Sequence, residues 1–368
     1  MLIVVGGGLA GLSAAITAAR AGLDVTVIEA GTYPRHRVCG EFLSPEAAGY
    51  LDQLGVLPAL KAQRPISIRR VQITAGNGAR WEGNLPGSGL GISRYALDHA
   101  LAEQARAAGV SVITGTQVKR IDGNLRDGFR VETPTATLHA RAVIAAHGKR
   151  SALDKALNRA FMRQRQPYIG LKAHFCGDIP PGRVDVHAFP GGYCGISGIE
   201  GGRVNVCLLA RLDVFQPCAS IPAFVAWMAA QNPHLARFFA GAQIESAWLS
   251  ISQVPFTPKS AVEGDILMAG DAAGMIAPLA GDGMSIALRG GMLAADGIAR
   301  WCAGEIDAVA LKRGYQATWR REFGGRVRLG RFLQASIFQP PVLAFGLPLM
   351  NAVPALGRYF ITGTRAAA

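Results

Sequence analysis

The first thirty residues alternate apolar runs with small residues. The run Leu2–Val5 predicts a buried strand, the alanine-rich run 12–21 a helix, and the run 24–29 a second strand. Two strands joined by a helix over about thirty residues form a βαβ unit. The chain therefore opens with a parallel-sheet architecture.

Three glycines stand between the first strand and the helix with the spacing of a dinucleotide-binding fingerprint. Gly6 permits a sharp turn, Gly8 lets a pyrophosphate approach the backbone, and Gly11 lets the helix pack closely on the strand. Glu29 ends the second strand, where its carboxylate can accept hydrogen bonds from ribose hydroxyls. The unit predicts an adenine dinucleotide site, but the fingerprint alone does not distinguish FAD from NAD.

Downstream, the pattern predicts a helix over 95–107 and strands over 110–113 and 142–146. Between 167 and 251 the chain changes to alternating, aromatic-rich runs separated by glycine turns, which are typical of an antiparallel sheet. We therefore expect a parallel sheet interleaved with an antiparallel one.

A second glycine-rich motif lies late in the chain. Residues 264–274 read as a turn, a buried strand and a polar stop at Asp271, and a helix is expected over 285–299. The Asp271 carboxylate can meet a polyol, and the glycine-rich helix start at Gly283 can meet a diphosphate. This pairing is what an extended ribityl chain requires.

Composition narrows the class of protein. The chain has 368 residues, of which 50% are hydrophobic and 17% charged, which excludes a disordered or coiled-coil protein. Its six cysteines form no CxxC pair, so neither a zinc ribbon nor a dense disulfide framework is predicted, and no metal site is expected. The apolar N-terminus lacks a basic region, and we expect a cytoplasmic protein.

The net charge of +13 is concentrated near the C-terminus. Residues 311–368 carry nine Lys and Arg against Glu322 alone, and positions 332–357 carry no charge. Prolines in this segment argue against a single spanning helix. The segment either lies against an anionic membrane at its inner face, or forms the mouth of a substrate tunnel, or simply completes the core. The arginines of 320–331 are not interleaved with stackable aromatics in a recognisable module, so nucleic-acid binding is not expected.

These motifs resemble the flavoprotein superfamily of para-hydroxybenzoate hydroxylase type monooxygenases, geranylgeranyl reductases and flavin-dependent halogenases. The likeness covers residues 1 to about 300. It rests on Gly6-x-Gly8-x-x-Gly11 with Glu29, on Arg37-Val38-Cys39-Gly40-Glu41-Phe42-Leu43-Ser44-Pro45, on Arg94-x-x-Leu97-Asp98, and on Gly270-Asp271 through Gly283. The Cys39-Gly40-Glu41 sequence is closest to the geranylgeranyl reductase branch.

The resemblance implies an α/β fold, with a Rossmann-like FAD-binding domain of the GR2 type interleaved with an antiparallel-sheet substrate domain and a helical C-terminal region. The implied FAD-binding parts are 1–75, 94–160 and 259–305. Substrate-sheet parts are 76–93 and 161–258, and the basic, apolar helical region is 306–368. By resemblance, adenosine meets Ala10, Glu29 and Val118, the diphosphate and flavin meet Cys39, Gly40, Phe42 and Arg94, and the ribityl and isoalloxazine end meets Asp271, Gly283 and Met284.

Three departures from the family patterns bear on the reaction. His147 stands where the hydroxylases carry an aspartate that helps bind FAD and NADPH. Residues 193–198 read Tyr-Cys-Gly-Ile-Ser-Gly instead of the aromatic-x-Trp-x-Phe-Pro stretch of the reductases. The halogenase tryptophan motif and early lysine are missing, since the first lysine is Lys61.

The expected function is FAD-dependent oxidation or reduction of a lipophilic small molecule, with NAD(P)H or a separate donor supplying electrons. The leading hypothesis is a monooxygenase acting on an aromatic or polyene substrate. The alternatives are a C=C reductase of isoprenoid or polyketide lipids, and a non-enzymatic flavin protein whose redox state controls membrane docking. Cys39 and Tyr193 are the candidate catalytic residues, while His174, His187 and Cys194 are weaker candidates near the substrate.

Overall fold

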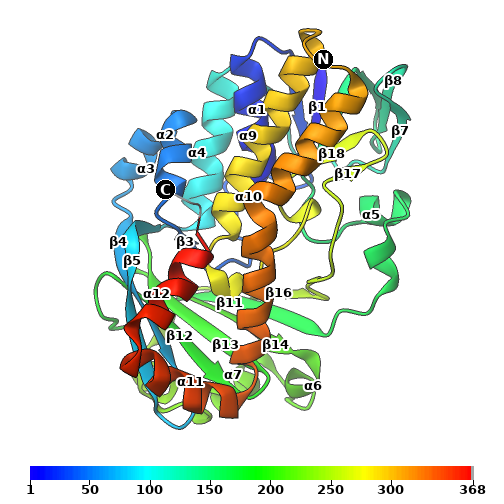
Figure 1. The fold of residues 1–368 in the computed structure, drawn as a ribbon. Coiled ribbons are helices and arrows are strands. Elements are labelled where there is room, and N and C mark those ends of the chain that lie inside the picture. Colours follow the sequence, from blue (N-terminus) through cyan, green and yellow to red (C-terminus); the bar gives the residue numbers. More distant parts are fainter. Residues whose placement is uncertain (366–368) are drawn as a thin grey trace.

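A six-stranded sheet forms one end of the computed structural model, which describes residues 1–365 (Figure 1). All its neighbouring strands run parallel except β17 and β18, and the central strands are buried along their whole length, as expected for strands covered on both faces. In spatial order the strands are β17 (Val262–Glu263), β18 (Ile266–Met268), β10 (Ala142–Ala145), β1 (Leu2–Val5), β2 (Val25–Ile28) and β6 (Ser111–Ile113). The predicted βαβ unit is confirmed.

Helices α1 (Leu9–Arg20), α4 (Arg94–Ala107) and α9 (Gly283–Cys302) pack against this sheet, and α1 and α9 touch very closely. Helices α2 (Ala47–Gln53) and α3 (Leu57–Ala62) pack on α9 and α4, and α5 (Ala152–Ala156) follows β10 in the chain. A Cβ on Gly291 of α9 would lie 2.1 Å from the Ala10 carbonyl oxygen of α1, so only glycine fits this crossing. Helices α1 and α9 begin three and two residues earlier than the sequence predicts, because each helix starts within its glycine motif.

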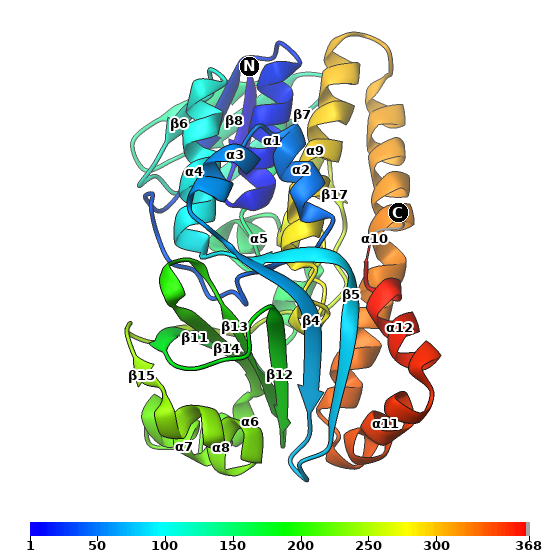
Figure 2. The same ribbon diagram turned by 90° about the vertical axis from the view of Figure 1, so that its left-hand side faces the viewer.

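The second sheet lies below the first in Figure 2 and is mainly antiparallel. Its order is β15 (Gln243–Ile244), β11 (Tyr168–Cys176), β14 (Val204–Arg211), β13 (Gly192–Gly198), β12 (Arg183–Phe189), β4 (Ile66–Thr74), β5 (Arg80–Gly91) and β3 (Phe42–Leu43), with β16 (Leu249–Ser252) beside β11. Strand β4 pairs here, although the predicted boundary at residue 75 grouped it with the cofactor-binding part. The β4–β12 pair is parallel, a departure from the expected pattern.

One face of this sheet packs on short helices, which leaves the other face toward the parallel sheet. The helices are α6 (Leu212–Phe215), α7 (Ile221–Ala230) and α8 (Pro233–Gly241), and they share an aromatic core with the sheet. A third sheet, made of β7 (Arg120–Asn124), β8 (Gly128–Glu132) and β9 (Thr137–Ala140), stands at the outer end of the molecule. This small sheet was not among the elements predicted from the sequence.

The C-terminal region ties the two sheets together (Figure 2). Helix α10 (Ala308–Ile337) runs along both, and α11 (Pro340–Ala352) and α12 (Pro354–Gly363) turn back beside β5. Within residues 1–365 no single helix is long and apolar enough to cross a membrane, but α10 and α11, bent by 112°, pass that test as a pair. The last three residues of the predicted region 306–368 lie outside the described part of the chain.

Candidate active site

A cavity of about 680 Å³ lies between the two large sheets and collects almost all of the predicted cofactor residues. Those that line it are Gly6, Gly8, Ala10, Glu29, Cys39, Gly40, Phe42, Arg94, Val118, Asp271, Gly283 and Met284. The predicted catalytic residues Cys39 and Tyr193 line it too. The predicted residues that line the cavity, from Gly6 to Met284, are up to 278 positions apart in the chain and therefore converge on one site.

The glycine fingerprint forms one end of the cavity. A Cβ on Gly8 would meet no atom within 4 Å, so its backbone faces open space that a pyrophosphate can approach. A Cβ on Gly11 would lie 1.8 Å from the Gly6 carbonyl oxygen, so Gly11 serves the helix–strand contact and does not line the cavity. Gly6 has φ +99°, a conformation that favours glycine.

Glu29 is held in place by neighbouring donors. Its carboxylate accepts hydrogen bonds from the backbone N–H of Gly7 at 2.6 Å and of Gly31 at 2.8 Å, and pairs with Arg35 at 2.5 Å. Burial by itself raises the pKa of Glu29, but the bonds from Arg35 and Gly31 outweigh it and the pKa is lowered. The carboxylate is therefore ionised and oriented, with remaining lone pairs for ribose hydroxyls.

The Cys39-Gly40 turn is fastened to the antiparallel sheet. Asn205 donates from Nδ2 to the Cys39 carbonyl at 3.2 Å, and Cys39 Sγ lies 3.7 Å from Met284 Sδ. Arg94 forms a two-point ion pair with Asp98, at 2.6 and 2.8 Å. Burial acts to lower the pKa of Arg94, but Asp98 and Cys39 raise it above its ordinary value. A fixed cation thus stands beside the Cys39 thiol.

Glu41 is the centre of a buried cluster that the sequence analysis did not single out. Its Oε1 accepts from Lys172 Nζ at 3.0 Å and from the Arg94 N–H at 2.9 Å, and its Oε2 lies 2.7 Å from His174 Nε2. His174, a weaker candidate, therefore lies behind the cavity wall, where it contacts Glu41. The Cys39-Gly40-Glu41 motif could have indicated Glu41 as a site residue. Lys172 could not be found in this way, because only the position of β11 in the sheet brings it to Glu41.

His147, which stands where the hydroxylases carry an aspartate, lies beside another acid, Asp154. His147 Nε2 lies 2.9 Å from Asp154 Oδ1, and Arg159 Nη1 lies 2.9 Å from the same oxygen. Burial acts to raise the pKa of Asp154, but His147 and Arg159 lower it to about 2. The cavity wall thus carries a histidine with a carboxylate behind it, where the hydroxylases carry a carboxylate alone.

A second acid sits behind the late glycine motif and reaches the C-terminal helices. Asp282 is buried and accepts from Ser44 Oγ at 3.1 Å, and it contacts Arg326 of α10. Arg326 also pairs with Glu46 at 3.0 Å. Burial and the neighbouring Glu46 raise the pKa of Asp282 well above its ordinary value, although Arg326 opposes the shift. Helix α10 is therefore anchored to the loop that opens α9.

Two of the weaker substrate candidates, Cys194 and His187, have side chains that point away from the cavity. Tyr193 lines it, but the next residue on β13, Cys194, packs in the core on the opposite face. His187 of β12 is also turned away, with Nδ1 2.8 Å from Thr74 Oγ1, while its neighbour Val186 lines the cavity. The alternation of side chains along a strand explains both corrections. Burial raises the pKa of Tyr193 well above its ordinary value.

The far end of the cavity is mostly apolar. Its lining comes from the antiparallel sheet and from the loops before α9, and includes Tyr193 and Ser197 beside the apolar Val71, Leu85, Val184, Val186, Leu209, Val254, Met275 and Leu279. Phe42 and Arg365 stand at the same end, with the guanidinium 5.6 Å from the ring centre. This half suits a hydrocarbon group placed next to the cofactor half.

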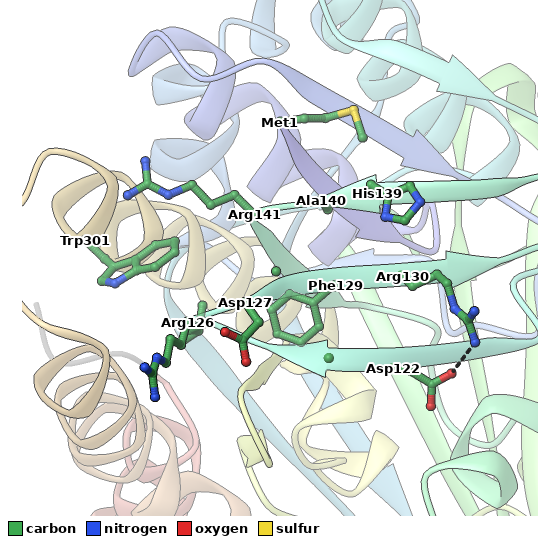
Figure 3. A pocket seen from close by; sticks show the side chains of 13 residues that line it. Met1, Asp122, Arg126, Asp127, Phe129, Arg130, His139, Ala140, Arg141 and Trp301 are labelled. Atoms are coloured by element: carbon green, nitrogen blue, oxygen red, sulfur yellow. Dashed lines mark ion pairs between the residues drawn. The ribbon is translucent and has the colours of Figure 1, made fainter.

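A separate, shallow depression lies over the small sheet (Figure 3). Arg126, Arg130 and Arg141 surround Phe129, and the Arg141 guanidinium lies 4.9 Å from the Trp301 ring centre. None of the predicted site residues lies here. The converging polar groups of the large cavity make it the candidate active site.

The fold and the cavity define a flavoprotein. Residues 1–175 match the family model of the FAD binding domain. The residues present fit FAD: the open space before Gly8, the ionised Glu29, and a long cavity that continues to Asp271 and Met284.

Curated relatives narrow the family. The chain is 30% identical over 341 residues to digeranylgeranylglycerophospholipid reductase 2 of Methanopyrus kandleri, covering 88% of this chain and 83% of the relative. It is 29% identical over 322 residues to menaquinone reductase of Mycolicibacterium smegmatis, covering 80% and 75%. The chain belongs to the family of FAD-dependent oxidoreductases that includes the geranylgeranyl reductases. It is an FAD-dependent enzyme, which sets the non-enzymatic alternative aside.

Solved structures share the fold. The flavin-dependent brominase Bmp2 superposes with a TM-score of 0.81 at 20% identity, covering 99% of this chain and 93% of that structure. A geranylgeranyl bacteriochlorophyll reductase-like protein from Thermoplasma acidophilum gives a TM-score of 0.73 at 20% identity, covering 92% and 87%. At these identities the likeness establishes the architecture.

Proposed function

We propose that the enzyme reduces a carbon–carbon double bond in a lipophilic isoprenoid chain. The observation that carries the proposal is the apolar half of the cavity, which continues directly from the cofactor half. The curated relatives named as reductases of a digeranylgeranyl lipid and of menaquinone support this substrate class. The leading sequence-based hypothesis was a monooxygenase, and the cavity serves either reaction.

The proposed FAD contacts follow the cavity from end to end. Ala10, Glu29 and Val118 hold adenosine, and the backbone around Gly6 and Gly8 holds the pyrophosphate. Further proposed contacts to the diphosphate and flavin are Cys39, Gly40, Phe42, Arg94, Asp271, Gly283 and Met284. Gly11 is proposed to act indirectly, by allowing the close helix–strand contact that shapes the glycine fingerprint.

Reduction of a C=C bond needs two electrons and two protons. Bound FAD, when reduced, supplies a hydride, and the second hydrogen must arrive as a proton. The protein's part is to hold the chain in the apolar half, exclude water and keep an acid beside the reacting carbons. Cys39 lies at the junction of the two halves, where an orienting or proton-bearing thiol is useful.

The test is anaerobic. FAD-loaded protein reduced with dithionite is incubated with a geranylgeranyl lipid or a menaquinone, and the product mass is measured. The expected product has gained two hydrogens per double bond. Unchanged lipid mass with both substrates would reject the proposal.

Monooxygenation is the second candidate, and one observation favours it. Residues 193–198 on β13, which line the cavity through Tyr193, Gly195 and Ser197, lack the aromatic reductase stretch. An oxygenase would consume oxygen in step with added aromatic or polyene substrate. Oxygen uptake that stays at background with such substrates removes this candidate.

The electron donor is proposed to be a separate protein or carrier that visits the site. His147 lies in the cavity wall with Asp154 behind it, and this arrangement differs from the carboxylate that helps NADPH in the hydroxylases. Slow reduction of bound FAD by NADH and NADPH, with fast reduction by an artificial donor, is expected. Rapid reduction by either nucleotide would contradict it.

The C-terminal helices are proposed to rest peripherally on an anionic membrane, at its inner face. Exposed apolar side chains cluster there, with Phe332 60%, Phe345 73% and Tyr359 63% exposed. Residues 323–365 contain no acid, and Arg328 and Arg358 are exposed among them. An apolar surface with a basic rim matches such a membrane.

Vesicle sedimentation tests this contact. Binding to phosphatidylglycerol vesicles, and not to phosphatidylcholine vesicles, is expected, and the Phe332→Ser/Phe345→Ser variant should lose it. Tyr95→Ser removes an aromatic that is 44% exposed on α4 and is the matched control. Equal sedimentation of both variants and the wild type would refute the contact.

A further inference from the structure

The structure holds a chain of acid–base groups that leads from the surface to the cavity. His36 is exposed and lines the cavity, and its ring centre lies 5.1 Å from that of His174 in an edge-to-face contact. His174 Nε2 lies 2.7 Å from Glu41 Oε2, and Glu41 lines the cavity. A nitrogen of each histidine and an oxygen of Glu41 lie within 4.8 Å of one another, a gap that one water can bridge.

The structure around Glu41 is unusual for a residue that merely packs. Glu41 is 0% exposed and has φ +52°, a left-handed conformation that is uncommon outside glycine and is often found at functional sites. Its backbone N–H points to Cys39 Sγ at 3.5 Å. The strained turn therefore brings the Glu41 backbone next to the Cys39 thiol, while the carboxyl group is held by Lys172 and His174.

Lys172 sets the charge of the cluster. Its ammonium lies 3.0 Å from Glu41 Oε1 and is almost fully buried, so it balances the carboxylate and opposes a metal ion at the same oxygens. The other titratable groups that face the cluster include Cys39, Arg94 beside it, Cys207 of β14, Arg203, and Tyr95, whose ring centre lies 4.9 Å from that of His36. Moving one proton from His174 to Glu41 leaves the net charge of the cluster unchanged at one positive charge, which Lys172 then carries.

We infer that Glu41 and His174 form an acid–base pair that takes protons from solvent through His36 and delivers them to the cavity. The inference rests on the proposed function. As the hydride adds to one carbon, the O–H bond of Glu41 breaks and a C–H bond forms at the other carbon from the electron pair of the double bond. Glu41 is then reprotonated from His174, and His174 from His36 or its bridging water. Glu41 is the catalytic residue, and Lys172 is a positioning residue.

The first experiment follows a single turnover. FAD-loaded protein reduced with dithionite is mixed anaerobically with a geranylgeranyl lipid, and reoxidation of the bound cofactor is recorded in H₂O and D₂O. Glu41→Gln is expected to slow it by about 100-fold, the usual contribution of a general acid. His36→Ala should slow it less, and free imidazole should restore the rate. His99→Ala, which removes another exposed histidine, is the matched control.

The second experiment needs no lipid. Reduced methyl viologen carries electrons and no protons, so mixing it with the FAD-loaded protein in weak buffer with a pH-indicator dye reports proton uptake from solvent. Uptake should keep pace with reduction in the wild type and in His99→Ala. In His36→Ala it should lag until imidazole is added.

The outcomes separate the two proposals. Lipid reduction at the wild-type rate by both Glu41→Gln and His36→Ala overturns the relay and leaves the reductase standing. Proton uptake that depends on His36, in a wild type that reduces no lipid, supports the relay and removes the reductase. If Glu41→Gln fails to bind FAD, the exposed His36→Ala variant decides: a full rate without imidazole overturns the relay.

Discussion

The two ends of the cavity are built in different ways. The cofactor end is made largely of backbone from short loops, where Gly6, Gly8, Gly281 and Gly283 leave the main chain uncovered by side chains. The apolar end is made of side chains from β4, β5, β12, β13 and β14, braced by the C-terminal helices. At the cofactor end an added side chain occupies space that the cofactor needs or that the backbone already fills, whereas the other end can change its shape by side-chain substitution. This difference suits a common cofactor and a variable substrate.

The largest expected effect comes from adding one methyl group at the cofactor end. Gly11→Ala places a Cβ 1.8 Å from the Gly6 carbonyl oxygen, which is backbone and cannot move aside. The variant should lose FAD and unfold at a much lower temperature. Gly8→Ala, whose Cβ meets nothing within 4 Å, should keep its apo stability and lose only FAD affinity. Flavin content measures FAD binding, and thermal unfolding of the apo protein measures stability. Equal flavin content and equal unfolding temperatures in the two variants would contradict the different roles of Gly8 and Gly11.

The next effect tests the brace between the two ends. Arg326→Met removes the cation that pairs with both Asp282 and Glu46, and leaves Arg365 as the other cation near the two acids. We expect a loss of about 3 kcal/mol in the free energy of unfolding, typical of a broken buried pair. Urea unfolding measures it. Adding Asp282→Asn should recover part of the loss, and a single variant as stable as the wild type would contradict the anchoring role.

A smaller effect concerns acid stability at the substrate sheet. Burial lowers the pKa of His187 to about 3, well below that of an exposed histidine. The unfolded chain then binds the extra proton between about pH 6.5 and 3, so stability falls as pH falls, by about 1.4 kcal/mol per pH unit. Urea unfolding across this window should show a shallower acid loss in His187→Gln. An unchanged slope would mean that His187 is not the group responsible.

The smallest effect is expected at Tyr193. Burial raises the pKa of its hydroxyl, which makes proton donation harder, and the ring stacks 6.2 Å from Phe338. Tyr193→Phe should change stability by less than about 1 kcal/mol and turnover by less than about tenfold. A loss of about 100-fold in turnover, with FAD content unchanged, would instead make Tyr193 a catalytic residue.

The sequence predicted the cofactor end far better than the substrate end, and the reason is physical. Gly6, Gly8 and Glu29 lie within one βαβ unit, so local spacing determines their geometry. Lys172 and His174 reach Glu41 only because β11 lies behind the Cys39-Gly40 turn, a contact across more than 130 positions. His187 and Cys194 were misplaced because the face on which a strand residue lies depends on the register of the strand in the sheet, which its pairing with other strands determines. The anchor from Arg326 to Asp282 likewise depends on tertiary packing.

The most direct test of the central claim is whether the lipid itself reoxidises the bound cofactor. Reduced, FAD-loaded protein is mixed with a geranylgeranyl lipid in the strict absence of oxygen, and the flavin absorbance is followed in a stopped-flow instrument. The account predicts reoxidation whose rate rises with lipid concentration and saturates. A flavin that stays reduced at every lipid concentration, and reoxidises only when oxygen is admitted, would contradict the claim that this cavity hydrogenates double bonds.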